Sequence, residues 1–122
     1  GHLLLLARVL ATLELSSDRL YGDAALTSEM FRETGAGPDA AEGIINLVTD
    51  VETVMVAALY RQTGADTWKV SLRSKGAVDV AALAQRHGGG GHKNAAGCSV
   101  AGSLGEVRAR IRGEIELMLK GE

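Results

Sequence analysis

The sequence predicts an α/β fold in which helices flank a mixed β-sheet of about four to five strands, with the elements in the order αβααββαβα. Segments with a helical pattern of apolar residues alternate along the chain with short runs rich in β-branched residues. No Pro- or Ser-rich linker interrupts them, and the 122 residues suit one domain. With 46% hydrophobic residues, the chain can form a packed core.

The first part of the chain predicts a helix, a strand and a second helix. Residues Leu3–Glu14 contain no Gly or Pro and are rich in Leu and Ala, which favours a helix. This helix is apolar on nearly every side and therefore needs a neighbour, so we expect the natural chain to continue N-terminally. Arg19–Leu26 follows as a strand, and Thr27 caps a helix over Ser28–Glu33.

The middle of the chain predicts a further helix and a β-hairpin. Asp39 caps a helix that runs to Val48. Val51–Tyr60 is apolar on both faces, as expected of a central strand. Gln62–Asp66 then forms a turn, and Thr67–Ser74 is the second strand of the hairpin.

The last part of the chain predicts a short helix, a strand and a long helix. Val78–Arg86 is helical until the glycines of Gly88–Gly91 end it. Ala95–Val100 is a strand, and Ser103 caps a helix with apolar residues at every fourth position. That helix also carries three arginines at alternate positions, Arg108, Arg110 and Arg112. They cannot all face one way, so we expect a solvated surface.

Composition excludes several classes of protein. The longest apolar run, Leu3–Ala7, is far too short to span a membrane, and the single Cys98 rules out an internal disulfide. We therefore expect a cytoplasmic protein without a membrane partner. Only 3% of the residues are aromatic, which argues against a surface that stacks many bases. The net charge of −2 excludes a strongly basic nucleic-acid binder, although basic residues outnumber acidic ones from Trp68 onward.

The strand Thr67–Ser74 predicts a cationic sheet face. Strand alternation points three apolar residues to the core, Trp68, Val70 and Leu72. The opposite face receives Lys69, Ser71 and Arg73. Arg73 can grip a phosphate with two parallel hydrogen bonds, and Lys75 is either a second point charge or a surface lysine. A merely solvated sheet face is the alternative.

A glycine-rich segment, Gly88–Gly97, is the second candidate feature. Four consecutive glycines cost roughly 0.5–1 kcal/mol each against alanine, and a simple turn needs only one or two. Close approach of a ligand is the usual reason, because phosphate oxygens accept hydrogen bonds from exposed N–H groups. His92, Lys93 and Asn94 add donors. The segment fits neither the P-loop nor the dinucleotide-binding pattern, and a flexible connector with an incidental histidine is the alternative.

Other candidate residues have simpler explanations. His87 lies at a helix C-terminus, where contact with the last carbonyls is sufficient. Cys98 lies in an apolar strand as a small buried residue, and a nucleophilic pair with His92 is disfavoured. The acidic residues are scattered, so no metal site is expected in this chain.

Three segments in series carry a family resemblance. Val70–Gly76, Val78–Ala84 and Gly88–Cys98 together resemble the DHH-associated C-terminal domain of the DHH phosphoesterases. Within that superfamily the pattern is most similar to the bacterial oligoribonuclease and 3′-phosphoadenosine 5′-phosphate phosphatase group. Thr27–Met30 and Glu42–Asn46 are similar to that group as well. The resemblance covers nearly the whole chain.

The resemblance implies a single substrate-binding domain over residues 3–122. Gly1 and His2 by themselves suggest the remainder of a purification tag. Family members face it with a DHH catalytic domain that holds two divalent metals, usually manganese. No Asp-His-His motif occurs in this chain, so the catalytic domain is absent and the fragment alone should be inactive. Expected partners are that domain of the same parent chain and short RNA or a nucleoside bisphosphate; a homodimer is left open.

The resemblance also implies how the substrate is held. Its phosphates would contact Arg73 and the glycine loop, with His92 nearest the reacting phosphate. The candidate substrate-binding residues are Ser71, Arg73, Lys75, Gly89, Gly90, Gly91, His92, Lys93 and Asn94. Two alternatives stay open: a cyclic-dinucleotide phosphodiesterase or single-strand exonuclease of the same superfamily, and a non-catalytic module like the one in alanyl-tRNA synthetases, which contacts tRNA.

Overall fold

A six-stranded mixed sheet forms the centre of the molecule, with the strands in the order β1-β2-β3-β4-β6-β5. The computed structural model describes residues 2–35 and 40–121. Only β2 and β3 are parallel, and every other neighbouring pair is antiparallel. The strands are β1 (Glu14–Leu15), β2 (Tyr21–Leu26), β3 (Val56–Gly64), β4 (Thr67–Ser74), β5 (Gly90–His92) and β6 (Ala95–Ala101).

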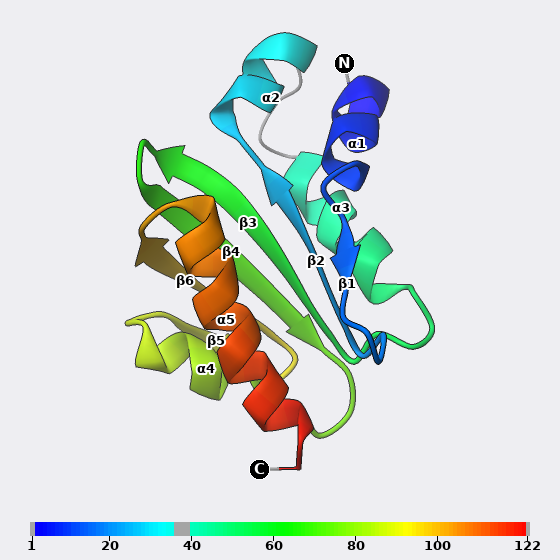
Figure 1. The fold of residues 1–122 in the computed structure, drawn as a ribbon, viewed down its shortest axis with the longest axis vertical. Coiled ribbons are helices and arrows are strands. Elements are labelled where there is room, and N and C mark those ends of the chain that lie inside the picture. The colour runs from blue at the N-terminus through cyan, green and yellow to red at the C-terminus, as the bar shows by residue number, and fades with distance from the viewer. Residues whose placement is uncertain (1, 36–39, 122) are drawn as a thin grey trace.

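Helices cover the two faces of the sheet unequally (Figure 1). The helices are α1 (His2–Leu10), α2 (Ser28–Thr34), α3 (Ala40–Thr49), α4 (Val80–Arg86) and α5 (Leu104–Leu119). On one face, α4 and α5 pack on an apolar cluster drawn from β2, β3, β4 and β6. On the other face, α1 and α3 cover an apolar cluster from β2 and β3, to which no described residue of β4, β5 or β6 belongs. That face of the β4–β6–β5 half therefore lies outside the helix-packed core.

The predicted α/β class is confirmed, but two strands were missed and some boundaries were wrong. The missed strands, β1 and β5, have two and three residues, too few for a period of two to be visible. Leu3–Glu14 is helical only to Leu10, and the strand expected over Val51–Tyr60 begins at Val56. The predicted caps Thr27 and Ser103 are confirmed, and Asp79 caps α4 rather than lying inside it. Asp39 lies outside the described residues.

A buried carboxylate joins α5 to the sheet. Asp23 of β2 is fully buried and accepts hydrogen bonds from the Arg108 Nε at 3.0 Å and from the Arg112 Nε at 2.9 Å. The Tyr21 hydroxyl donates to the same carboxylate at 2.6 Å and lies 2.8 Å from the hydroxyl of Tyr60. Burial raises the pKa of both tyrosines well above the ordinary value, and the nearby Asp23 carboxylate adds to the rise.

This network corrects the expectation of a solvated arginine surface. Arg108 and Arg112 are four residues apart on a helix and therefore share a face, which α5 turns toward Asp23. Only Arg110, between them, is exposed. The sequence showed the arginines but not their partner, which is more than 80 residues away along the chain.

No helix in the described part of the chain is long and apolar enough to cross a membrane.

Replacing Asp23 by Asn should lower the free energy of unfolding by about 3–5 kcal/mol, because two guanidinium groups would lose their buried carboxylate partner. Urea denaturation followed by circular dichroism measures the change. Arg110→Ala is the matched control on the exposed side of α5, and it should change stability by less than about 0.5 kcal/mol. A decrease in the free energy of unfolding below about 1 kcal/mol for Asp23→Asn would mean that the contacts of Asp23 with Arg108 and Arg112 do not hold α5 to the sheet.

Candidate functional site

Strand β4 presents the two faces that its alternation predicts. Trp68, Val70 and Leu72 are buried under α4 and α5. Lys69, Ser71 and Arg73 are each partly exposed, and they point to the opposite face because successive side chains of a strand alternate. The cationic face predicted from the sequence therefore exists, on the side of the β4–β6–β5 half that faces away from α4 and α5.

The short strand β5 brings His92 into line with Arg73. His92 pairs with Ala95 of β6, and Ala95 pairs in turn with Arg73 of β4. Residues paired across strands have their side chains on the same face. Arg73, Ala95 and His92 thus form one row across the sheet, which we call the Arg73 row. Neighbouring strands are about 4.8 Å apart, so the arginine and histidine backbones lie roughly 10 Å apart with only a methyl group between them.

A second row lies one step along the strands. Ser71 pairs with Gly97, and Gly97 pairs with Gly90 of β5. We call this the Ser71 row. It presents a hydroxyl at one end and two residues without side chains beside it. The two rows together form one surface that is edged by Arg73, Ser71 and His92 and has open space over Gly90.

Close packing against β6 explains two of the four consecutive glycines. A Cβ at Gly89 would overlap the carbonyl oxygen of Gly97 and lie 2.7 Å from the Cys98 Cβ. Gly91 has a φ of +141°, and a Cβ there would lie 2.6 Å from the Ala95 carbonyl oxygen. A Cβ at Gly88 or Gly90 would meet no atom within 4 Å, but Gly88 has a φ of +78°. Ligand approach is therefore not needed to explain Gly89 or Gly91, contrary to the sequence-based interpretation.

A hydrogen-bond network fastens the turn after His92 to the end of β4. Asn94 donates from its side-chain amide to the Ser74 hydroxyl at 2.9 Å and to the Gly76 carbonyl at 3.2 Å. The buried Ser74 donates to the Val78 carbonyl at 2.6 Å, and its N–H donates to the Asn94 carbonyl. Asn94, predicted as a ligand donor, thus uses its amide to hold the turn that positions His92.

The two predicted lysines differ in their surroundings. The Lys75 ammonium donates to the Val51 carbonyl at 3.1 Å, so this residue supports the loop before β3. Lys93 is exposed, and its backbone carbonyl accepts from the Val80 N–H. The Arg73 guanidinium donates to the Leu72 carbonyl at 3.0 Å. Of the predicted residues, the structure brings Ser71, Arg73, Gly90 and His92 together on one surface.

Cys98 and His87 lie apart from this surface. Cys98 is buried on the α5 side of the sheet, where burial raises the pKa of its thiol, and His92 lies on the opposite face. The two cannot form a nucleophilic pair. His87 contacts Glu114 of α5 at 2.9 Å, a partner that its sequence position did not reveal.

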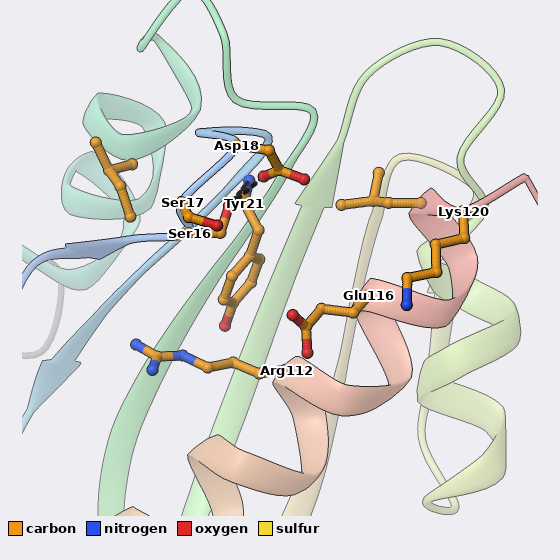
Figure 2. Close-up of a pocket in the computed structure, with 9 residues that line it drawn as sticks. Ser16, Ser17, Asp18, Tyr21, Arg112, Glu116 and Lys120 are labelled. Atoms are coloured by element: carbon orange, nitrogen blue, oxygen red, sulfur yellow. Dashed lines mark hydrogen bonds between the residues drawn. The ribbon is translucent and has the colours of Figure 1, made fainter.

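Sequence reasoning also missed a pocket of about 230 Å³ on the α5 side (Figure 2). Its lining residues come from the β1–β2 turn and from the C-terminal part of α5: Leu15, Ser16, Ser17, Asp18, Tyr21, Arg112, Glu116, Leu119 and Lys120. No local motif marks them. In the described residues, no three His, Cys, Asp or Glu side chains come together as metal ligands.

Comparisons with known proteins agree on one family. A family model described as the DHHA1 domain matches residues 22–119. The chain is 32% identical over 98 residues to the bifunctional oligoribonuclease and PAP phosphatase NrnA of Thermus thermophilus. That alignment covers 80% of this chain but only 28% of the relative.

Two solved structures have a similar fold. An exopolyphosphatase-related protein from Bacteroides fragilis superimposes with a TM-score of 0.84 at 27% identity, over 94% of this chain and 34% of that one. The pGpG-specific phosphodiesterase PggH from Vibrio cholerae superimposes with a TM-score of 0.61 at 11% identity, over 99% of this chain and 40% of that one. The second likeness concerns the fold alone.

The packing of the glycines predicts opposite outcomes for two neighbouring substitutions. Gly89→Ala should destabilise the domain by roughly 1–3 kcal/mol or more, because its methyl group would overlap β6. Gly90→Ala should change stability by less than about 0.5 kcal/mol, because its methyl group would project into open space. Thermal or urea unfolding of both variants measures the difference. Equal stabilities would contradict the close packing of this segment on β6.

Proposed function

The chain belongs to the DHHA1 domain family, and from this premise we propose that it is the substrate-binding domain of a metal-dependent phosphoesterase. The proposed substrates are short oligoribonucleotides, nucleoside 3′,5′-bisphosphates or both. The 32% identity to an oligoribonuclease and PAP phosphatase supports this choice of substrate class. The chain spans less than a third of the length of that relative, so the activity of the whole protein is part of the proposal.

The observation that carries the proposal is the Arg73 row. A guanidinium and an imidazole flank a single methyl group on the β4–β6–β5 half of this sheet face, where no described residue joins the apolar core cluster. A guanidinium can donate two parallel hydrogen bonds to one phosphate, and a histidine can donate a further one. The phosphate would lie over Ala95, between its two donors.

The Ser71 row extends the same surface. The Ser71 hydroxyl can donate to an oxygen of a second phosphate. Gly90 leaves open space for a close approach of the ligand. In the described part of this surface no aromatic side chain occurs, since Tyr21, Tyr60 and Trp68 are buried toward α5. A site of this kind holds phosphates and does not stack several bases, which suits a ligand of one or two nucleotides.

The chemistry of hydrolysis is assigned to a DHH catalytic domain of the same parent chain. Two divalent metals, manganese in the usual case, would activate water there. The described residues of this chain offer no cluster of metal ligands, so no step of the proposal runs through a metal held by this domain. Arg73, Ser71 and His92 bind and orient the substrate's phosphates.

A phosphodiesterase of the same superfamily acting on a dinucleotide is the second candidate, and a pGpG-specific enzyme shares the fold of this chain. Both candidates place phosphates on the same rows. A binding module of the kind found in alanyl-tRNA synthetases would instead bind tRNA and have no catalytic partner. Binding of a mononucleotide bisphosphate by the isolated domain separates this module from the phosphoesterases.

Titration with adenosine 3′,5′-bisphosphate tests the proposed site. Arg73→Ala and His92→Ala should each weaken binding by more than about tenfold, because a hydrogen bond to a charged group is worth roughly 1.5–3 kcal/mol. Arg110→Ala removes the same charge from the exposed side of α5 and should leave the affinity unchanged. Isothermal calorimetry provides the dissociation constants.

The same preparation tests the division of labour between the domains. The isolated domain should bind the bisphosphate without hydrolysing it, even with manganese added. Unchanged affinity in both the Arg73 and His92 variants would refute the assigned site. Robust manganese-dependent turnover by the pure domain would refute the assignment of catalysis to a separate domain.

A further inference from the structure

Lys69 lies over the bare backbone of Gly97. A Cβ built on Gly97 would lie 3.2 Å from the Lys69 Cε and 3.9 Å from its Nζ. Lys69 belongs by register to the row of Ser99, one step beyond Gly97. Its side chain therefore leans along the sheet toward the Ser71 row and brings the ammonium above the place where a side chain is missing.

Among the described residues, Lys69 has no acidic partner. Arg61 of β3 is its direct cross-strand neighbour, and like charges in this position destabilise a sheet. Among the residues that the structure describes, no carboxylate forms an ion pair with Lys69 or Arg61. Two adjacent cations without an acidic partner among these residues create a positive potential that favours an anion from outside the domain.

The distance between this ammonium and the Arg73 row indicates how far apart the two charged groups of a bound anion would be. Rows on one sheet face are separated by two residues of a strand, or about 6.7 Å. The Lys69 ammonium, the Ser71 hydroxyl and the Gly97 backbone therefore lie one such step from the Arg73 row. Two phosphates bridged by one ribose have a separation of this order, whether they belong to a bisphosphate or to a dinucleotide.

We propose that Lys69, together with the Ser71 hydroxyl and the bare surface of Gly97, forms a second phosphate subsite beside the Arg73 row. The ligand class is a nucleoside with phosphates on both its 3′ and 5′ positions, as in a nucleoside bisphosphate or a 5′-phosphorylated dinucleotide. This inference rests on the proposed function, which places the first phosphate between Arg73 and His92. Lys69 then makes the domain selective for two phosphates over one.

Gly97 has a defined part in this subsite. Any side chain there would contact the Lys69 methylenes, because 3.2 Å is closer than an ordinary van der Waals contact. Lys69 would have to swing away from the Ser71 row. Lys69 pairs with Ser99, two residues beyond Gly97. Because Gly97 has no side chain, the Lys69 side chain can extend over it to the Ser71 row.

Selectivity for the second phosphate is the direct test. Dissociation constants are measured for adenosine 3′,5′-bisphosphate and for the better-binding of the two adenosine monophosphates. Lys69→Met should weaken the bisphosphate by about tenfold, as expected for one charged hydrogen bond, and leave the monophosphate within about twofold. Lys120→Met, the same charge change at the exposed end of α5, should alter neither ligand.

Several outcomes would overturn the second subsite while leaving the proposed function intact. An equal loss for both ligands in Lys69→Met would show a general effect of charge. No loss for the bisphosphate would remove Lys69 from the site. The proposed function fails separately, if Arg73→Ala and His92→Ala leave the affinity for both ligands unchanged.

Gly97→Ala provides an independent variant with Lys69 intact. It should weaken the bisphosphate in the native background but have no further effect in the Lys69→Met background. Equal losses in both backgrounds would overturn the role assigned to Gly97. Repeating the Lys69→Met titration with 5′-phosphorylated diadenylate identifies the source of the second phosphate. A larger loss of affinity for the dinucleotide indicates an internal phosphodiester. A larger loss of affinity for the bisphosphate indicates a terminal 3′-phosphate.

Discussion

The close approach of the glycine segment to β6 is the constraint on which the candidate site depends. Gly89 and Gly91 have no room for a side chain because β6 occupies that space. Their closeness allows residues 90–92 to pair as a strand at the sheet edge, and pairing fixes which face His92 uses. A longer or looser connection would leave the histidine free to turn away from Arg73. The glycines thus allow the backbone to pair with β6, and this pairing in turn orients His92 toward a ligand.

The two faces of the sheet differ in how their charged residues are paired. On the α5 side, Asp23 and its two arginines join a helix near the C-terminus to a strand near the N-terminus, and these charges are neutralised within the protein. On the other side, Lys69 and Arg61 have no carboxylate partner among the described residues. Because charges paired within the protein are not available to a ligand whereas unpaired cations attract anions, the second face is better suited to phosphate binding.

Much of the fold and part of the candidate site could be predicted from the sequence. The features that could not be predicted were missed for physical reasons. The alternation of Thr67–Ser74 predicted the faces of β4 correctly, and the caps Thr27 and Ser103 predicted two helix starts. The partners of Asp23 and the row that joins Arg73 to His92 depend on pairing between distant segments, which periodicity does not reveal. Asn94 resembled a ligand donor in the sequence, yet its amide holds the turn beside β4.

Amide NMR of the labelled domain titrated with adenosine 3′,5′-bisphosphate tests the central claim most directly. If phosphates bind across the β4–β6–β5 surface, the amides of Ser71, Arg73, Gly90, His92 and Gly97 should shift together with a single dissociation constant. The amides around Arg112 and Lys120, which line the pocket under α5, should remain unchanged. Shifts confined to that pocket, or shifts at His92 without any at Arg73, would contradict the account.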